Sequence, residues 1–225
     1  MLLNKPISLN IDDIIEKIVD KNLGGYCFEH NKLFYEVLLS LGFDVELILA
    51  RVSNNQKIES PRTHRVTLLN YKGKKYLIDV GFGAMTPSEP LDISKENKIT
   101  NNYKISQNKN NDFVLKIKKK KSFITLYTFN VVQYSEADCI MGNYYSESHP
   151  NAVFVNNLVI SRKLEDKTLS FRNNSYHHIS KTYTNILHIT DSLQLLKLLK
   201  NDFGITITKK EAQLLFQKSE NFRLR

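Results

Sequence analysis

Residues 45–134 form a series of short apolar segments, rich in β-branched residues, separated by short polar turns. This pattern predicts strands, because β-branched side chains pack well on a pleated sheet. Segments 65–70 and 75–80 flank Tyr71-Lys72-Gly73-Lys74, which has the length of a hairpin loop. Several short strands at this spacing predict a small antiparallel sheet or barrel. The predicted strands are 45–52, 65–70, 75–80, 103–106, 112–117 and 122–133.

Helical patterns precede this strand-rich region. Apolar residues recur at helical spacing between residues 11 and 19, behind the possible caps Asn10 and Asp12. After Gly24-Gly25, a second helix is predicted to begin near Cys27 and to end at Gly42. Residues 135–225 mix both periods, with predicted helices at 135–145, 192–201 and 209–218 and predicted strands at 153–161, 168–172 and 176–181. The order predicts an α+β fold in three regions, 1–44, 45–134 and 135–225.

The composition excludes several classes of protein. The chain has 225 residues, of which 41% are hydrophobic and 24% charged, as in an ordinary globular protein. It has no apolar run long enough to span a membrane and no signal-peptide pattern at its start, so we expect a cytoplasmic protein. Two cysteines are too few for a disulfide framework or a cysteine-rich zinc site, so we expect free thiols and no metal.

The formal net charge of +9 admits two interpretations. A basic surface can bind phosphate groups, either of nucleic acid or of a phosphorylated cofactor. Much of the excess lies in one run, KIKKKK at residues 116–121, which is more typical of a solvated strand-pair tip. No nucleic-acid motif accompanies the run, so we expect no nucleic-acid partner.

Cys27 lies in the segment LGGYCFEHN at residues 23–31. The two glycines permit a sharp turn or a close backbone approach, and the cysteine then falls at the start of a helix. At that position the unpaired N–H groups and the helix dipole favour an anion, so a thiolate is stabilised. The alternative is a small buried core residue, which many free cysteines are.

His64 and Asp79 lie near the far ends of the two strands that the Tyr71–Lys74 turn joins. Antiparallel pairing around that turn would bring the two side chains together. An aspartate in an apolar strand is costly unless it has a partner, and an imidazole is a suitable one. Each residue alone also has a structural explanation, since a lone histidine is often a satisfied packing residue. Together with Cys27 they predict a Cys-His-Asp catalytic triad.

The segments GGYCFEHN, THRVTLL and YLIDVGFG occur in an order and at separations that resemble the arylamine N-acetyltransferases, and YYSESHPNAVFVNNL at residues 144–158 resembles a late segment of that family. The resemblance implies a helical bundle, a β-barrel and an α/β lid. It also implies that acetyl-CoA acetylates Cys27, with His64 as the base and Asp79 holding it. The acetyl group then passes to an arylamine, hydrazine or arylhydroxylamine. Phe82 matches a position that lines the family's substrate pocket, and Thr63 and Ser148 match segments near its CoA cleft.

The chain departs from the family pattern at Leu23, where an arginine usually precedes the two glycines. The family's usual earlier helical segment, with an acidic partner for that arginine, also has no counterpart here. We expect a shortened natural form in which Leu23 packs where the ion pair would lie; either the thiol is then more exposed, or a second subunit completes the bundle as a homo-oligomer. Alternative functions are a polyketide-type amide synthase or a cysteine hydrolase with the same triad, and a catalytically silent binding protein with this fold.

Overall fold

The computed structural model describes residues 1–53 and 60–221. Contacts within the chain divide it into two compact units. We call Leu9–Ile15 with Gly24–Asn143 the barrel unit, and Met1–Ser8, Glu16–Leu23 and the described residues from Tyr144 onward the C-terminal unit. The three regions predicted from the sequence are a different division, and their boundaries stay a prediction.

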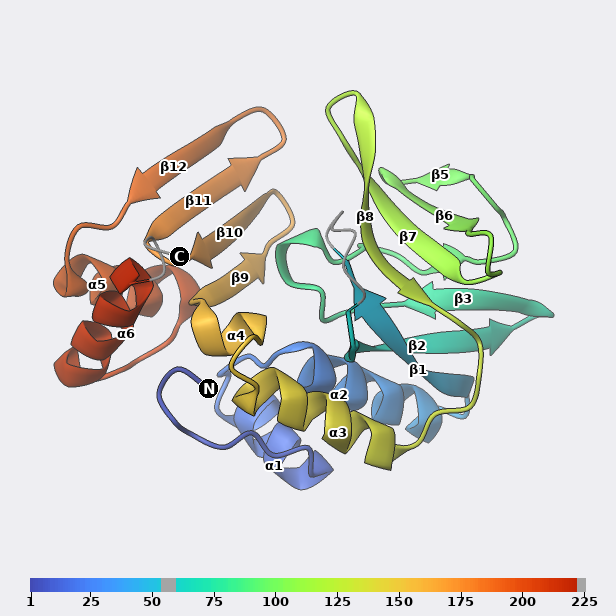
Figure 1. The fold of residues 1–225 in the computed structure, drawn as a ribbon, viewed down its shortest axis with the longest axis horizontal. Helices are drawn as coiled ribbons and strands as arrows, with labels where there is room; N and C mark the ends of the chain where they lie inside the picture. The colour runs from blue at the N-terminus through green and yellow to red at the C-terminus, as the bar shows by residue number, and fades with distance from the viewer. Residues whose placement is uncertain (54–59, 222–225) are drawn as a thin grey trace. The chain divides into compact units, whose positions relative to one another are not determined.

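The barrel unit is built on an eight-stranded antiparallel sheet that curves into a barrel-like form (Figure 1). The strands follow the order β4-β3-β2-β1-β8-β7-β6-β5, so β4 and β5 are the outer strands. The predicted α+β class and the predicted barrel are therefore confirmed. The strands are β1 (Asp44–Val52), β2 (Arg62–Tyr71), β3 (Lys74–Ile78), β4 (Leu91–Asp92), β5 (Ile99–Thr100), β6 (Tyr103–Gln107), β7 (Phe113–Lys119) and β8 (Ser122–Phe129).

The predicted β2–β3 hairpin is also confirmed. Tyr71 pairs with Lys74, and the two residues between them, Lys72 and Gly73, have φ angles of 50° and 73°. Positive φ at both central positions is the turn geometry that matches the twist of a tight hairpin. Thr67 pairs with Ile78, so Asp79 follows directly on the last paired residue of β3. The register therefore brings the end of β3 beside the middle of β2, three residues after His64.

The core of the barrel unit is apolar and buried. Alternate residues of the strands point inward, as the period of two along a strand requires. Among the described residues, the buried core consists of Ile48, Ala50, Val66, Leu68, Leu77, Leu91, Ile93, Tyr103, Ile105, Leu115, Ile117, Leu126, Tyr127 and Phe129. Burial of this much apolar surface is the main stabilising contribution to such a fold.

Helices cover one side of this sheet. The helix α1 (Ile11–Ile15) begins at Asn10, whose side-chain oxygen accepts a hydrogen bond from the Asp12 amide at 2.8 Å. The helix α2 (Cys27–Ser40) packs against β1 and β2 and ends before Gly42, whose φ of +80° suits a helix terminus. A π-helical turn at Glu16–Asp20 follows α1, which the sequence pattern did not predict.

The C-terminal unit contains a four-stranded antiparallel sheet in the order β12-β11-β10-β9. Its elements are β9 (Val159–Lys163), β10 (Lys167–Arg172), β11 (Ser175–Ser180), β12 (Thr184–His188), α4 (Val153–Asn156), α5 (Ser192–Phe203) and α6 (Lys209–Asn221). Asp191 caps α5 by accepting hydrogen bonds from two backbone amides at 2.8 Å, and Gly204 ends it with a φ of 71°. This mixture of helices and strands matches the prediction. That the unit lies over the rest of the chain as a lid stays a prediction.

One predicted strand in this unit is wrong, and one strand was not predicted. Residues 153–161 divide into the short helix α4 and the strand β9. The Asn156 amide donates to the Ala152 carbonyl at 2.9 Å, and such local side-chain bonds compete with strand pairing. The strand β12 is fully exposed along its length, so it lacks the apolar alternation that would reveal it.

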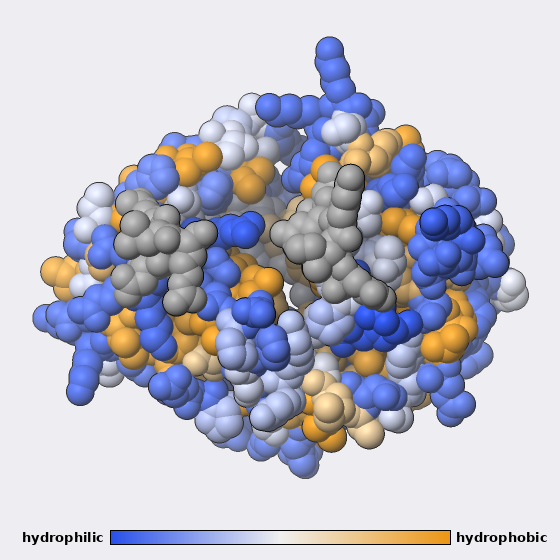
Figure 2. Space-filling view, viewed as in Figure 1, coloured by the Kyte–Doolittle hydropathy of each residue, from blue (hydrophilic) through white to orange (hydrophobic). Residues whose placement is uncertain are grey.

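The basic run at residues 116–121 lies where the sequence predicted it, at the turn between β7 and β8, and Lys118–Lys121 are exposed. Hydrophilic residues cover most of the face drawn in Figure 2, with small hydrophobic groups scattered between them. No described helix combines the length and the apolar character that crossing a membrane requires.

Candidate active site

Cys27 is the first residue of α2, as predicted, and its side chain is 6% exposed. The thiol donates to the Thr63 carbonyl oxygen at 3.6 Å. Two side chains of the same helix fix the turn before it. The Tyr26 amide donates to a Glu29 carboxylate oxygen at 3.0 Å, and the Gly25 amide donates to His30 Nε2 at 3.0 Å. The two residues that lead into the helix therefore have their amides bonded to side chains of its first turn.

Leu23 does not pack into the interior, because its side chain is 39% exposed. The expectation that it fills the position of the family's usual ion pair stays a prediction. The turn beside Cys27 is held by the hydrogen bonds of Glu29 and His30.

His64 and Asp79 form a buried pair. His64 lies in β2 and is 2% exposed, and Asp79, directly after β3, is 3% exposed. His64 Nε2 lies 2.8 Å from Asp79 Oδ2. The other ring nitrogen, Nδ1, makes no bond to Asp79, and the Cys27 side chain lies close enough to the imidazole to raise the pKa of His64. The structure thus brings together the three residues that the sequence predicted as a triad.

The Asp79 carboxylate accepts four hydrogen bonds. On Oδ1 the donors are Asn31 Nδ2 at 3.1 Å and the Gly81 amide at 2.9 Å. On Oδ2 they are His64 Nε2 at 2.8 Å and the Tyr127 hydroxyl at 3.0 Å. Two donors to each oxygen use the full accepting capacity of a carboxylate. A buried charge is tolerated when it is satisfied in this way.

The electrostatics of the pair favour the charged forms. Burial by itself would lower the pKa of His64, but the Asp79 carboxylate and the hydrogen bonds to Asp79 and Cys27 raise it to about 10. Burial would raise the pKa of Asp79, but the His64 charge and the bonds from His64, Gly81 and Asn31 hold it below 3.8. An imidazole of this kind can accept the thiol proton, which is what a nucleophilic cysteine requires.

Gly81 permits a close approach between the end of β3 and the start of α2. A Cβ atom at this position would lie 2.8 Å from the Cys27 Cα and 2.7 Å from Asn31 Nδ2. No ordinary side chain fits such a gap without displacing one of the two segments. The absence of a side chain at Gly81 therefore helps to set how close Cys27 lies to the His64–Asp79 pair.

Aromatic rings surround the imidazole. Phe82 stands edge-on to His64 with ring centroids 4.9 Å apart, and Tyr127 lies 5.0 Å from the same ring. The Phe82 and Tyr127 rings are 5.2 Å apart, so the three rings contact one another. Phe82 is half-buried, so part of its ring remains accessible beside His64.

The two predicted CoA-contact residues differ in position. Thr63 precedes His64 and accepts the Cys27 hydrogen bond through its carbonyl, which places its backbone beside the thiol. Ser148 is the last residue of α3 (Glu136–Ser148), is exposed and belongs to the C-terminal unit. The triad residues belong to the barrel unit, and both CoA-contact roles stay predictions.

Three residues near the triad escaped the sequence analysis. Asn31 lies four positions after Cys27, so helical spacing gave a usable signal for it. Tyr127 and Arg65 gave no such signal, because their positions follow from the sheet. Arg65 is fully buried, and its Nη1 donates to Glu136 Oε1 at 2.7 Å and contacts Cys139 Sγ at 3.6 Å.

Cys139 has the properties of a structural cysteine. Its side chain is 0% exposed and lies in the cluster that contains Phe28 and Leu49. Burial raises the pKa of its thiol to about 11, although Arg65 acts in the opposite direction. A thiol with so high a pKa is a poor nucleophile near neutral pH. Cys27 is the better candidate of the two.

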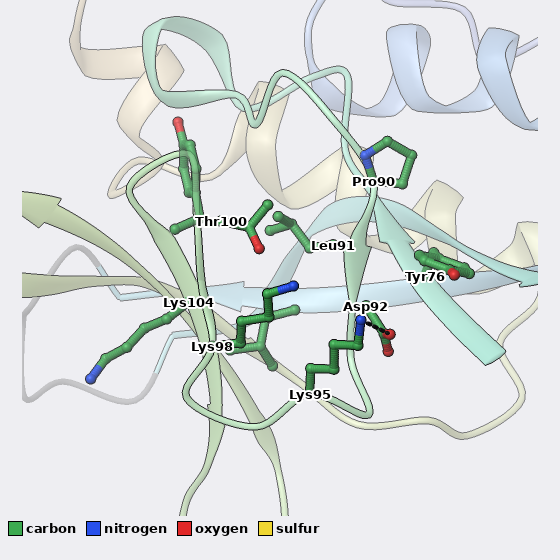
Figure 3. A pocket seen from close by; sticks show the side chains of 10 residues that line it. Tyr76, Pro90, Leu91, Asp92, Lys95, Lys98, Thr100 and Lys104 are labelled. Carbon is green, nitrogen blue, oxygen red and sulfur yellow. Dashed lines mark ion pairs between the residues drawn. The ribbon is translucent and has the colours of Figure 1, made fainter.

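A separate pocket, of about 150 Å³, lies between the outer strands β4 and β5 (Figure 3). Lys95 forms an ion pair with Asp92 at 3.7 Å at its mouth, and Lys104 lies over the Phe123 ring. None of the triad residues lines this pocket. Within residues 1–53 and 60–221, no group of three or more His, Cys, Asp or Glu side chains could hold a metal ion.

Comparisons with known proteins agree with the resemblance seen in the sequence. The N-acetyltransferase family model matches residues 1–212. The arylamine N-acetyltransferase of Escherichia coli (strain K12) is 30% identical over 213 residues, which cover 92% of this chain and 75% of the relative. The solved arylamine N-acetyltransferase from Salmonella typhimurium has a TM-score of 0.88 at 27% identity, covering 96% of this chain and 83% of that chain. The Mycobacterium marinum arylamine N-acetyltransferase in complex with CoA has a TM-score of 0.89 at 25% identity, covering 97% and 85%. The resemblance noted in the sequence is confirmed, and this chain belongs to the arylamine N-acetyltransferase family.

Proposed function

We propose that this chain transfers an acetyl group from acetyl-CoA to the nitrogen of an arylamine or hydrazine, or to an arylhydroxylamine, through a thioester on Cys27. The observation that carries the proposal is the buried Cys27–His64–Asp79 arrangement in a member of this family. The solved Mycobacterium marinum relative in complex with CoA supports acetyl-CoA as the donor.

In the first half-reaction His64 accepts the proton of the Cys27 thiol. The thiolate attacks the carbonyl carbon of the acetyl group, and the bond from that carbon to the sulfur of CoA breaks. CoA leaves with its sulfur electron pair and takes up the proton from His64. Asp79 stays ionised throughout and stabilises the imidazolium, as the carboxylate of a triad does.

In the second half-reaction the amine nitrogen attacks the thioester carbonyl. His64 accepts a proton from that nitrogen, and the carbon–sulfur bond to Cys27 breaks. The products are the acetylated amine and the Cys27 thiolate beside protonated His64, and transfer of that proton to the thiolate restores the starting thiol. In each half His64 accepts one proton and gives one away, so one histidine is sufficient.

The residues around the triad suggest how the substrates bind. The accessible part of Phe82 beside His64 offers an apolar surface for an aromatic ring. The Thr63 backbone beside the thiol and the exposed Ser148 hydroxyl are the proposed CoA contacts. The net charge of +9 suits the phosphates of CoA. A cytoplasmic location and a possible homo-oligomer belong to the same proposal.

The test measures CoA release from acetyl-CoA with and without a simple arylamine or hydrazine. We expect release that depends on the amine, and its loss in Cys27→Ser. The matched control is Cys139→Ser, which removes the other thiol and should leave the reaction intact. Equal release without an amine would indicate a hydrolase. Absence of release from the folded protein with any amine would contradict the proposal.

A further inference from the structure

Asn31 occupies an unusual position among the residues of the barrel unit. It lies one helical turn after Cys27 on α2, and its side chain is 1% exposed. Its amide nitrogen donates to the Arg65 carbonyl at 2.7 Å and to Asp79 Oδ1 at 3.1 Å. Its amide oxygen accepts from the Val80 backbone amide at 3.0 Å. Both side-chain protons and the oxygen are therefore used.

These three bonds join the three segments that carry the triad. Asn31 shares α2 with Cys27, the Arg65 carbonyl directly follows His64 in β2, and Val80 directly follows Asp79. Because the planar amide of Asn31 donates on one side and accepts on the other, it fixes the distances and the orientation of these three segments relative to one another. Few other side chains offer donors and an acceptor in so short a space.

Asn31 also limits how the Asp79 carboxylate can rotate. Asn31 and the Gly81 amide hold Oδ1, and this leaves Oδ2 directed at His64. Without Asn31, Oδ1 would lose one of its two donors in a buried environment. A buried carboxylate oxygen that lacks a donor is unfavourable, so the Asp79 carboxylate would rotate toward other donors. Its hydrogen bond to His64 would then weaken.

We propose that Asn31 is a positioning residue, which holds the Asp79 carboxylate against His64 and fixes the helix start that carries Cys27 relative to both. The inference rests on the proposed function, because it assigns Asn31 to the same reaction. It acts through Asp79 and does not touch the reacting atoms.

The test measures how the rate of Cys27 alkylation by iodoacetamide depends on pH. The titratable groups that face His64 are Cys27, Asp79 and Tyr127. If Asn31 orients Asp79, then Asn31→Ala weakens the interaction between the Asp79 carboxylate and protonated His64. The Cys27 thiolate is then less stable and takes up a proton at a higher pH. We expect the midpoint of the alkylation profile to rise by about one pH unit, which corresponds to one hydrogen bond to a charged group. Mass spectrometry of the Cys27 peptide separates this reaction from that of Cys139.

Two control variants separate positioning from loss of stability. Asn70→Ala removes an asparagine amide that also donates to a carboxylate, Glu46, at 2.9 Å in the same unit. Leu195→Ala removes a buried core side chain of the C-terminal unit, which contains none of the triad residues. Both should leave the midpoint unchanged. Asn31→Ser, a smaller change, should shift it in the same direction if the alanine variant fails to fold.

A double-mutant cycle gives the decisive result. If Asn31 acts through Asp79, adding Asn31→Ala to Asp79→Asn should cause no further rise in the midpoint. An unchanged midpoint in folded Asn31→Ala, or an equal further rise in the Asp79→Asn background, would overturn the proposal. Alkylation needs neither acetyl-CoA nor an amine, so this result stands even if the proposed acetyl transfer fails its own test.

Discussion

Replacing Gly81 by alanine adds one methyl group at the point where the triad segments approach most closely. The new Cβ would meet the Cys27 Cα at 2.8 Å, the Cys27 carbonyl oxygen at 3.2 Å and Asn31 Nδ2 at 2.7 Å. Two of these three atoms belong to the backbone of α2, which cannot move as a flexible side chain does. We therefore expect the end of β3 and the start of α2 to separate.

The magnitude follows from the cost of overpacking. An extra methyl group in a close-packed interior costs about 1–3 kcal/mol, because neighbouring atoms must shift. For a chain of this length that corresponds to a decrease in Tm of about 2–12 °C. The same separation would increase the distance between the Cys27 thiol and the His64 imidazole. We expect the rate of acetyl transfer to decrease about 100-fold, since misplacement of a catalytic group by about 1 Å has an effect of that size.

The assay combines urea unfolding with the rate of CoA release. The matched control is Gly42→Ala at the other end of α2, where φ is +80° and no atom lies within 4 Å of the added Cβ. That change strains the backbone and costs about 1 kcal/mol, but it should leave the rate intact. If Gly81→Ala were as stable and as active as the wild type, the close approach described here would be wrong.

Three further predictions follow from the contacts of the buried pair and of Arg65. The pKa of His64 is raised from 6.5 to about 10, so its contribution to stability is complete below pH 6.5 and is lost as the pH rises through about 10. The pKa of Asp79 is lowered from 3.8, so its contribution is complete above pH 3.8 and is lost as the pH falls through its folded value. Urea unfolding across both ranges should show these losses in the wild type and not in a His64→Gln, Asp79→Asn double variant, and equal profiles would count against the ion pair. Tyr127→Phe removes the hydroxyl donor 3.0 Å from Asp79 Oδ2. It should slow CoA release about 10-fold, which corresponds to the loss of one hydrogen bond to a charged group. An unchanged rate would exclude a role for that hydroxyl. Glu136→Gln leaves the fully buried Arg65 without its 2.7 Å carboxylate partner. Urea unfolding should show a free energy of unfolding lower by about 3 kcal/mol, the low end of the cost of breaking a buried ion pair, because Glu136 is partly exposed. A change below about 1 kcal/mol would place the pair among weak surface salt bridges.

The sequence was sufficient to predict the elements that carry the triad. The β-branched segments around Tyr71–Lys74 identified the hairpin, and its register brings His64 to Asp79. The glycines before Cys27 identified the start of α2. These signals are local, because a turn and a helix start depend on neighbouring residues. The family resemblance then supplied the chemistry that no single residue could indicate.

The contacts that support the triad depend on the packing of distant segments. Tyr127 lies 48 positions from Asp79, and its hydroxyl reaches the carboxylate only because β8 pairs beside β1. Arg65 looks like a surface residue in a strand, yet α3 supplies Glu136 and permits its burial. The short helix α4 was mistaken for a strand, because β-branched residues predict strands and the Asn156 amide bonds could not be anticipated.

The central claim is that Cys27 carries the acetyl group between the two substrates. The most direct measurement is mass spectrometry of the protein after incubation with acetyl-CoA and no acceptor, with the modified residue identified in peptides. We predict one acetyl group on Cys27, lost when an arylamine or hydrazine is added, and no modification in His64→Gln. An unmodified folded protein, or an acetyl group on Cys139 alone, would contradict it.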